Sequence, residues 1–296
     1  ACKTYLKGRE LFKDKTKYTY ELSYIYQIEG KDEDIAKEYL VLLESNPDYL
    51  SQIEVNLNNL FERDKNDKLV LSINNIVLEK VKENPNNNSF NELYLWLLMQ
   101  KNDYQGAFNQ AKAIDKRFNK GDGGVVFEFA ENSLNSKQYN IAEKAFSYIV
   151  EKGKDNMYYE KSRIDKVACL YLPFMDKPNN DKQEIDKLKN EFSSSLKDLG
   201  ETQNTVELMQ NYAYLLAYHL NEAQEAVDIL DSTINMRQVS MNDKAKSKLM
   251  RADIFLFQGD VGQASLTYSQ VENDRENDVP GSQAKFRHAM LPYYPG

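Results

Sequence analysis

The sequence has little glycine and proline, with 12 and 7 residues among 296. All-β sandwiches and barrels need many turns, so this shortage excludes them and favours long helices. An apolar run of about 18 residues is also lacking, so we expect no membrane-spanning helix. Hydrophobic residues make up 41% of the chain and charged residues 28%, which indicates a folded protein rather than a disordered one.

Histidine, cysteine and positive charge are also scarce. Two histidines, His219 and His288, are too few for most metal or catalytic sites that use histidine. Cys2 and Cys169 lie far apart and show no C-x-x-C spacing. The 38 basic and 46 acidic residues give a net charge of −8, whereas nucleic-acid binders normally carry a basic face. We therefore expect no cofactor, no metal site and no nucleic-acid partner.

The sequence carries no motif of a known catalytic site. The glycine cluster at 121–124 lacks the Lys-Ser/Thr pair of a phosphate loop, so we interpret it as a helix end and turn. The acidic loops at 62–68, 176–181 and 272–278 lack the order of calcium ligands and are interpreted as solvated turns. Neither a nucleophile elbow nor an H-E-x-x-H motif is present. We predict that the protein is not an enzyme, with an α-helical enzyme as the third-ranked alternative.

A helical pattern recurs along the chain at intervals of 34 to 38 residues. Its clearest copies carry an aromatic residue, alanine three positions later and a third residue four positions further on, all on one helical face. These copies are Tyr104–Ala107–Ala111 and Tyr139–Ala142–Phe146. A small central residue lets two helices approach closely. The central residues along the chain are Ala36, Val70, Ala107, Ala142, Ala226 and Ala264.

Each copy follows another amphipathic stretch, so each repeat is predicted to be a helix, a turn and a second helix. In period and aromatic positions the pattern resembles tetratricopeptide (TPR) repeats over most of residues 17–296, and it is similar to large multi-repeat TPR proteins of the Bacteroidetes. The resemblance implies an all-α fold, a right-handed α-solenoid of about six and a half TPR-like hairpins. Pentatricopeptide repeats, which need a basic surface, and Sel1-type repeats, which are richer in glycine and alanine, match less well.

We predict a single solenoid over 1–296 whose repeats differ in clarity. They are degenerate at 17–85, clear at 86–153, irregular with an insert at 154–200 and clearer again at 201–275. In the irregular repeat, the helices are expected at 158–172 and 182–199, joined by the insert 173–180. The TPR pattern also places a small residue midway along each first helix, and we assign this position to Ala130, Ala252 and Ala289.

The last segment, 280–296, is predicted to be a first helix without a partner helix. It indicates either a truncated repeat of a longer solenoid or an uncapped end through which the chain self-associates. At the other end, Ala1-Cys2 fits the junction left when a bacterial lipoprotein leader is removed. The contrary interpretation is an ordinary cysteine near an arbitrary start. Lipidation would place the protein in the periplasm or cell envelope, and its absence in the cytoplasm.

In TPR solenoids the first helices line a concave groove, so the resemblance implies a partner site there. The residues expected in the groove are Trp96, Met99, Phe127, Leu134, Tyr218 and Phe257. Aromatic side chains with polar tips suit a protein segment, although a shift of register would return them to the core. The basic clamp of peptide-binding TPR domains is absent, because the matching positions hold Glu92, Trp96, Phe127 and Glu131. An acidic, apolar groove favours a partner with apolar anchors and positive charge.

These features predict a non-catalytic scaffold or adaptor that binds a protein or peptide segment in the concave groove. The alternative is a cell-envelope lipoprotein that takes part in nutrient uptake or envelope assembly.

Overall fold

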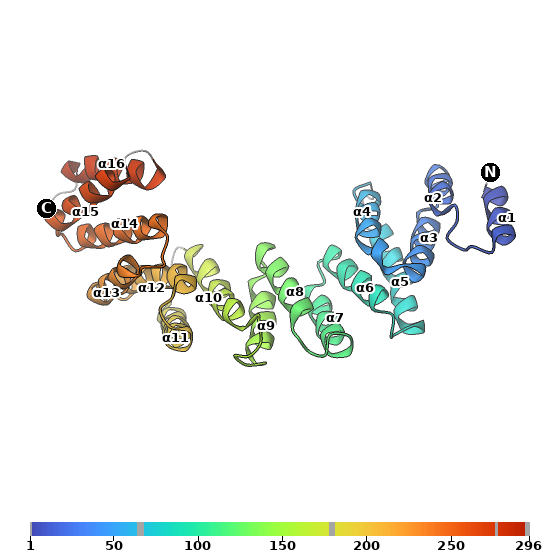
Figure 1. Cartoon of the computed structure of the whole chain (residues 1–296), viewed down its shortest axis with the longest axis horizontal. Coiled ribbons are helices and arrows are strands. Elements are labelled where there is room, and N and C mark those ends of the chain that lie inside the picture. The colour runs from blue at the N-terminus through green and yellow to red at the C-terminus, as the bar shows by residue number, and fades with distance from the viewer. Residues whose placement is uncertain (1, 64–67, 178–180, 276–277, 294–296) are drawn as a thin grey trace. The chain divides into compact units, whose positions relative to one another are not determined.

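The computed structural model describes residues 2–63, 68–177, 181–275 and 278–293. These ranges contain sixteen α-helices, three short 3-10 helices and no strand (Figure 1). The predicted all-α class is therefore confirmed. None of the helices in these ranges is long and apolar enough to cross a membrane. The chain divides into two compact units, unit 1 at residues 1–158 and unit 2 at residues 159–296, and each is described by itself.

Unit 1 consists of one helix followed by four helix pairs. The first helix is α1 (Cys2–Phe12), and the pairs are α2 (Thr19–Ile28) with α3 (Asp32–Ser45), α4 (Leu50–Phe61) with α5 (Lys68–Glu83), α6 (Asn88–Gln100) with α7 (Tyr104–Arg117), and α8 (Gly124–Asn135) with α9 (Tyr139–Val150). A 3-10 turn, Pro47–Tyr49, precedes α4. The second helix of one pair packs against the first helix of the next, as α5 does on α6 and α7 on α8. Helix α4 is the exception within its pair, because it packs on α3 and α6 and hardly on α5.

Unit 2 contains three helix pairs and a last helix. The pairs are α10 (Tyr159–Met175) with α11 (Lys182–Leu199), α12 (Val206–His219) with α13 (Ala223–Asn235), and α14 (Met241–Phe257) with α15 (Val261–Asp274); α16 (Val279–Met290) follows. Short 3-10 turns lie at Gln203–Thr205 and Leu291–Tyr293. Helix α16 packs on both α14 and α15, as the first helix of a further pair would.

The small residues of the repeat lie where the helices meet. All six central residues lie in second helices, and all are buried: Ala36, Val70, Ala107, Ala142, Ala226 and Ala264. In the first helices, Ala130 and Ala252 are fully buried. Small residues at these points allow the close helix contacts of a hairpin repeat, so the TPR-like architecture predicted from the spacing is confirmed.

The small residue of the last first-helix was assigned wrongly. Ala289 is exposed near the end of α16, whereas Ala284 is fully buried against α15. The reason is the helix start: the Asp278 carboxylate accepts a hydrogen bond from the Gly281 amide at 3.1 Å, and Pro280 occupies the first turn. The buried small residue of α16 is therefore Ala284, five residues before the predicted Ala289.

The insert of the irregular repeat is shorter than predicted. Helix α10 continues through Pro173 to Met175, although proline has no N–H for the helical ladder. The next residue, Phe174, is buried against the core of unit 2, and this burial favours the extra turn. The second helix, 182–199, is found as predicted. Residues 178–180 of the insert, and parts of the three acidic loops, lie outside the described residues.

The glycine cluster at 121–124 forms a turn between helices, as predicted. Gly121 and Gly123 have φ values of 76° and 91°, which only glycine adopts readily. The fully buried Asp115 carboxylate accepts hydrogen bonds from the Gly123 amide at 2.7 Å and from Lys152 Nζ and Tyr148 Oη at 2.8 Å each. The turn is therefore held by a buried acid between α7 and α9.

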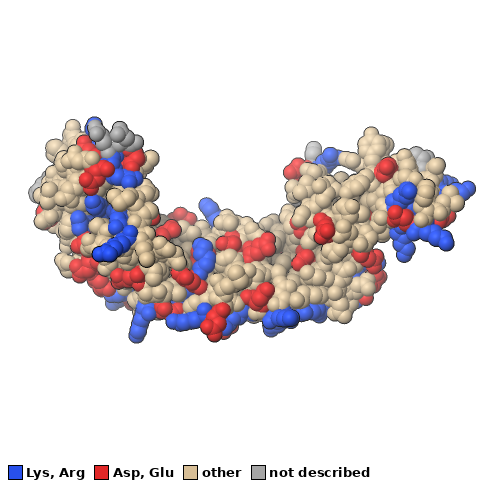
Figure 2. Space-filling view, viewed as in Figure 1, with Lys and Arg blue, Asp and Glu red and all other residues tan. Residues whose placement is uncertain are grey.

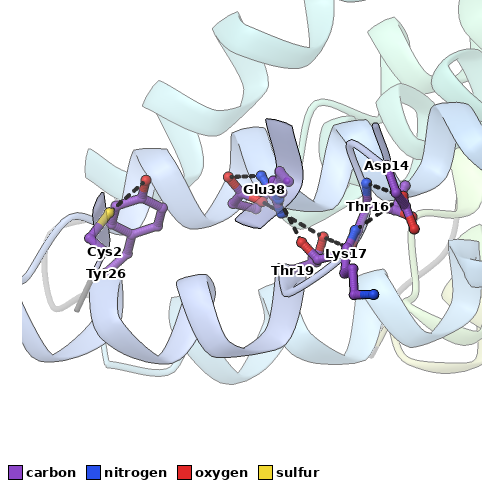
Figure 3. Close-up of polar contacts among 8 residues, drawn as sticks. Cys2, Asp14, Thr16, Lys17, Thr19, Tyr26 and Glu38 are labelled. Carbon is purple, nitrogen blue, oxygen red and sulfur yellow. Dashed lines mark hydrogen bonds and ion pairs between the residues drawn. The ribbon is translucent and has the colours of Figure 1, made fainter. Parts of the chain in front are cut away.

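Helix α1 lies outside the predicted repeats and is attached mainly by polar contacts (Figure 3). The Arg9 guanidinium donates to both oxygens of Glu38, at 3.0 and 2.5 Å, to Thr19 Oγ1 at 3.1 Å and to the Lys17 carbonyl at 2.6 Å. Cys2 Sγ lies 3.6 Å from the Tyr26 hydroxyl. No residue of α1 is buried, so its position depends on these polar contacts and on the contact between the Tyr5 and Tyr18 rings, whose centroids lie 5.1 Å apart.

Candidate functional site

The six residues predicted to line a groove all lie on first helices. Five are half-buried, namely Trp96, Met99, Phe127, Leu134 and Tyr218, and Phe257 is 59% exposed. The first four belong to α6 and α8 in unit 1, and the other two to α12 and α14 in unit 2. They therefore form two separate groups. In each group, the side chains pack on neighbouring residues with one part and expose the rest.

The aromatic residues of unit 1 bridge neighbouring helices. The Trp96 ring on α6 stacks on Phe61 of α4, with 5.9 Å between ring centroids. The Phe127 ring on α8 stacks on Tyr158 at 4.8 Å and meets the buried Phe146 edge-on at 6.1 Å. One side of each ring stabilises the repeat, and the half-exposed remainder of Trp96 and Phe127 forms surface.

Three carboxylates lie beside these rings, one on each of three successive first helices. Burial, and then repulsion from Glu128 and Glu92, raise the pKa of Glu54 to about 7. Burial also raises the pKa of Glu92, and Glu128 adds to the rise, although a hydrogen bond from Asn88 opposes it. The side chains of α4, α6 and α8 are thus close enough to repel one another. We call Glu54, Phe61, Glu92, Trp96, Phe127 and Glu128 the acidic–aromatic surface.

This surface would be stabilised by a bound positive charge. Near neutral pH, Glu54 is about half protonated, because its pKa is about 7. A cation placed among the three carboxylates would offset their repulsion and favour the ionised form of Glu54. Figure 2 shows acidic side chains set in wide uncharged areas over the part of unit 1 that includes α6 and α8. Isolated negative charges on otherwise uncharged surface suit a segment that mixes positive and apolar side chains.

Unit 2 carries a continuous row of rings across α10, α12 and α14. Centroid distances are 4.9 Å from Phe174 to His219, 5.9 Å from His219 to Tyr214, 4.7 Å from Tyr214 to Tyr218 and 5.0 Å from Tyr218 to Phe257. Burial lowers the pKa of His219, which favours the neutral form of its ring. We call these five residues the aromatic row.

A serine, a histidine and a glutamate also meet in unit 2. Ser265 Oγ lies 3.0 Å from His288 Nε2, and His288 Nδ1 lies 3.3 Å from Glu272 Oε2. The sequence spacing had given His288 neither acid nor nucleophile, and the structure corrects this. Ser265 lies within α15, where the following amides belong to the helical ladder and offer no oxyanion donors. We interpret the three residues as a polar contact between α15 and α16.

The structure adds residues that sequence reasoning missed. Glu54 and Phe61 lie on α4, in the degenerate region where the repeat register could not be assigned. Glu128 is adjacent to the predicted Phe127, but an exposed acid on an acidic chain carries no signal by itself. Tyr214 lies one turn before the predicted Tyr218, and this i, i+4 spacing could have found it. Among the described residues, no group of three or more potential metal ligands comes together.

Known proteins resemble the chain only in fold. No protein-family model and no curated protein matches it. Among solved structures, it is similar to a tetratricopeptide repeat protein from Parabacteroides merdae, at 12% identity over 94% of this chain and 99% of that one, with a TM-score of 0.39. It is also similar to BtubC from P. vanneervenii (11% identity, 75% and 90% coverage, TM-score 0.44) and to pilF of Pseudomonas aeruginosa (12%, 81% and 96%, TM-score 0.42). Likeness at this level assigns no function.

Proposed function

We propose that the protein is a non-catalytic interaction scaffold, and that its acidic–aromatic surface binds a partner segment in which a lysine or arginine stands beside an apolar residue. The observation that carries the proposal is the placement of Glu54, Glu92 and Glu128 on three successive first helices beside the Phe61–Trp96 stack, where burial, and to a smaller extent Glu128 and Glu92, raises the pKa of Glu54. Such an arrangement costs stability in the free protein, and a bound cation would recover it.

The two parts of the surface have different roles in this proposal. The carboxylates accept charge-assisted hydrogen bonds from the cationic group of the partner. The half-exposed face of Trp96 contacts the apolar neighbour or the cation itself, since indole is the best aromatic partner for a cation. Because Phe61 fixes the Trp96 ring by stacking, the ring loses little conformational freedom when a partner binds.

A charge-scanned peptide library tests the proposal. Each fluorescently labelled peptide carries Lys, Arg, Glu or Ala at one central position, flanked by Leu or Phe. Its affinity for the protein is measured by fluorescence polarisation. We expect Lys and Arg peptides to bind, and Glu92→Gln and Trp96→Ala each to weaken them about tenfold. Glu143→Gln on α9 makes the same charge change outside the surface and should leave binding unchanged.

Two results would reject this partner chemistry. One is a peptide affinity that does not depend on the charge of the central residue. The other is an equal loss of affinity in Glu92→Gln and Glu143→Gln. Circular dichroism of each variant separates lost binding from lost folding, which matters because Trp96 also packs on Phe61.

A further inference from the structure

Helices α2 and α4 face each other across an open cleft in unit 1, away from the acidic–aromatic surface. The cleft has a volume of about 220 Å³. One wall is the α2 face that carries Tyr20, Ser23, Tyr24 and Gln27. The other is formed by Asn56, Asn59 and Leu60 of α4 together with Arg63, which follows the end of that helix. Both sets follow i, i+3, i+4, i+7 spacing, so the helical residues of each lie on one face. Ile35 and Tyr39 of α3 complete the lining. We call this site the tyrosine–amide cleft.

Several polar side chains of the cleft make no hydrogen bond within the described part of the protein, whereas Asn56 Oδ1 accepts one from Gln52 at 3.1 Å. Ser23 is 5% exposed, and its buried hydroxyl makes no hydrogen bond. Ser23 lies close to the Tyr39 hydroxyl and lowers the pKa of Tyr39, against the larger effect of burial, which raises it. No side-chain hydrogen bond joins the exposed Gln27, Asn59 or Arg63 to the described residues. For the buried Ser23 hydroxyl, the missing hydrogen bond costs free energy, which a ligand would recover.

The tyrosines offer ring surface as well as hydroxyls. Tyr20 is 52% exposed and Tyr24 is 65% exposed, although both belong to a packed helix. Neither ring stacks on another aromatic ring or pairs with a cation among the described residues. The cleft thus combines two exposed tyrosine rings with the side-chain amides of Gln27, Asn56 and Asn59, the Ser23 hydroxyl and the Arg63 guanidinium.

This combination selects a class of ligand. An amide side chain presents donors and an acceptor together, which matches a hydroxyl group that both donates and accepts. The cleft residues include no carboxylate and one cation, so strong charge in the ligand is not required. The apolar lining residues Ile35 and Leu60 are buried and leave no hole for an apolar side-chain anchor. We propose that the tyrosine–amide cleft binds a neutral oligosaccharide.

In this arrangement the apolar C–H face of a sugar ring lies on Tyr20 or Tyr24, and its hydroxyls bond to Gln27, Asn56 and Asn59. One sugar ring occupies this cleft. The adjoining cleft of about 700 Å³ is lined by charged residues, namely Lys31, Asp32, Glu33, Asp34 and Lys68, so it does not belong to the site for a neutral ligand. The two clefts share Gln27, Leu60 and Arg63. Ser23 accepts or donates the bond that it lacks in the free protein.

A glycan array tests the proposal with the intact chain. The probes are neutral glucans, mannans, xylans, galactans and N-acetylated oligosaccharides, and the affinity for the best one is then measured by titration calorimetry. We expect Tyr24→Ala and Asn59→Ala each to weaken binding about tenfold. Asn58→Ala removes an exposed amide from the same helix but outside the cleft, and should bind as the wild type does.

Ser23→Ala provides a second test, because the hydroxyl has no hydrogen bond to lose. We expect this variant to unfold at an unchanged or higher urea concentration, yet to bind the sugar more weakly. Failure of the wild type to bind any neutral glycan would overturn the proposal, as would equal loss in Asn58→Ala and Asn59→Ala. Competition for the cleft by uncharged peptides alone would assign it to a protein segment instead.

The outcome is separable from the proposed scaffold function. Glu92→Gln and Trp96→Ala lie outside the cleft and should leave glycan binding intact, whereas Asn59→Ala should leave the binding of charged peptides intact.

Discussion

At the scale of single residues, Asp115 shows how a buried charge is used for structure. Its carboxylate is fully buried, yet it receives three hydrogen bonds, one of them from Lys152. Burial alone would raise the pKa of Asp115, but the bonds from Lys152, Gly123 and Tyr148 outweigh it and lower the pKa below the usual value. The glycine turn between α7 and α8 therefore depends on an ionised acid.

Removing the cation of this network should destabilise unit 1. Lys152→Met keeps the length of the side chain but leaves the Asp115 charge buried and unpaired, which should cost about 3 kcal/mol. Urea unfolding at neutral pH measures the loss, with Lys144→Met on exposed surface of α9 as the control. Because the folded pKa of Asp115 is depressed, its contribution is present above the unfolded value of 3.8 and is lost as the pH falls below it. An equal cost for both lysine variants would contradict this role.

Glu54 should produce the opposite dependence on pH. Its folded pKa of about 7 exceeds the unfolded value of 4.5, so the folded state binds the extra proton between these values. The free energy of unfolding should therefore decrease as the pH rises from 4.5 to 7. Glu54→Gln should remove that part of the slope and stabilise the protein by about 1–2 kcal/mol at pH 8, allowing for solvent screening. An unaltered slope in urea titrations would refute the raised pKa of Glu54, which burial causes chiefly and the neighbouring carboxylates to a smaller extent.

The Ser265–His288–Glu272 contact makes a chemical prediction. A serine activated for nucleophilic attack reacts with fluorophosphonate probes, whereas a helical serine without oxyanion donors should not. We expect no labelling of Ser265, as judged by mass spectrometry of the treated protein. Labelling that disappears in His288→Ala would reopen the enzyme interpretation.

At the scale of helices, the hairpin register is the property that the sequence predicts best. The small residues at Ala107, Ala142 and Ala264 reveal it because close helix contact tolerates nothing larger. Prediction failed where that constraint is weak or another effect intervenes. Helix α1 has no buried residue and is positioned mainly by polar contacts, and Pro173 suggested a helix end that the burial of Phe174 prevents.

The corrected register of α16 can be tested directly. Ala284→Leu should force three additional side-chain carbon atoms into the contact with α15 and cost about 1–3 kcal/mol. Ala289→Leu makes the same change at an exposed site and should alter the free energy of unfolding by about 0.5 kcal/mol or less. A larger effect at Ala289 would restore the register that spacing alone had indicated.

The candidate site was less predictable than the fold. The half-buried rings of Trp96 and Phe127 could be placed on first helices, because those helices carry a recognisable repeat. The carboxylate cluster could not be predicted, since it depends on Glu54 in a degenerate repeat and on the spatial closeness of three helices. The tyrosine–amide cleft lies in the same poorly matched region, where Asn56 and Asn59 look like ordinary surface residues.

At the scale of the whole molecule, the chain consists of two compact units whose contacts are mostly internal. Each unit has its own hydrophobic core, around Leu43 and Phe90 in unit 1 and around Phe192 and Leu216 in unit 2. In a repeat protein, each helix pair is stabilised by its neighbours, so cooperativity is limited in range. The two units are therefore expected to unfold separately.

Calorimetry of core variants tests this expectation. Ala142→Leu should lower the unfolding temperature of one transition, that of unit 1, and Ala284→Leu that of the other. A single transition shifted equally by both substitutions would show that the chain unfolds as one cooperative body.

Helix α4 carries residues of both proposed sites. Glu54 and Phe61 belong to the acidic–aromatic surface, and Asn56, Asn59 and Arg63 line the tyrosine–amide cleft on another face of α4 and its C-terminal extension. A ligand that moves this helix at one site changes the other site as well. Thermodynamic linkage then requires reciprocity: the factor by which a sugar alters affinity for a protein segment equals the factor by which that segment alters affinity for the sugar. If both proposed sites bind their ligands, the affinity of the protein for one ligand would therefore depend on whether the other is bound.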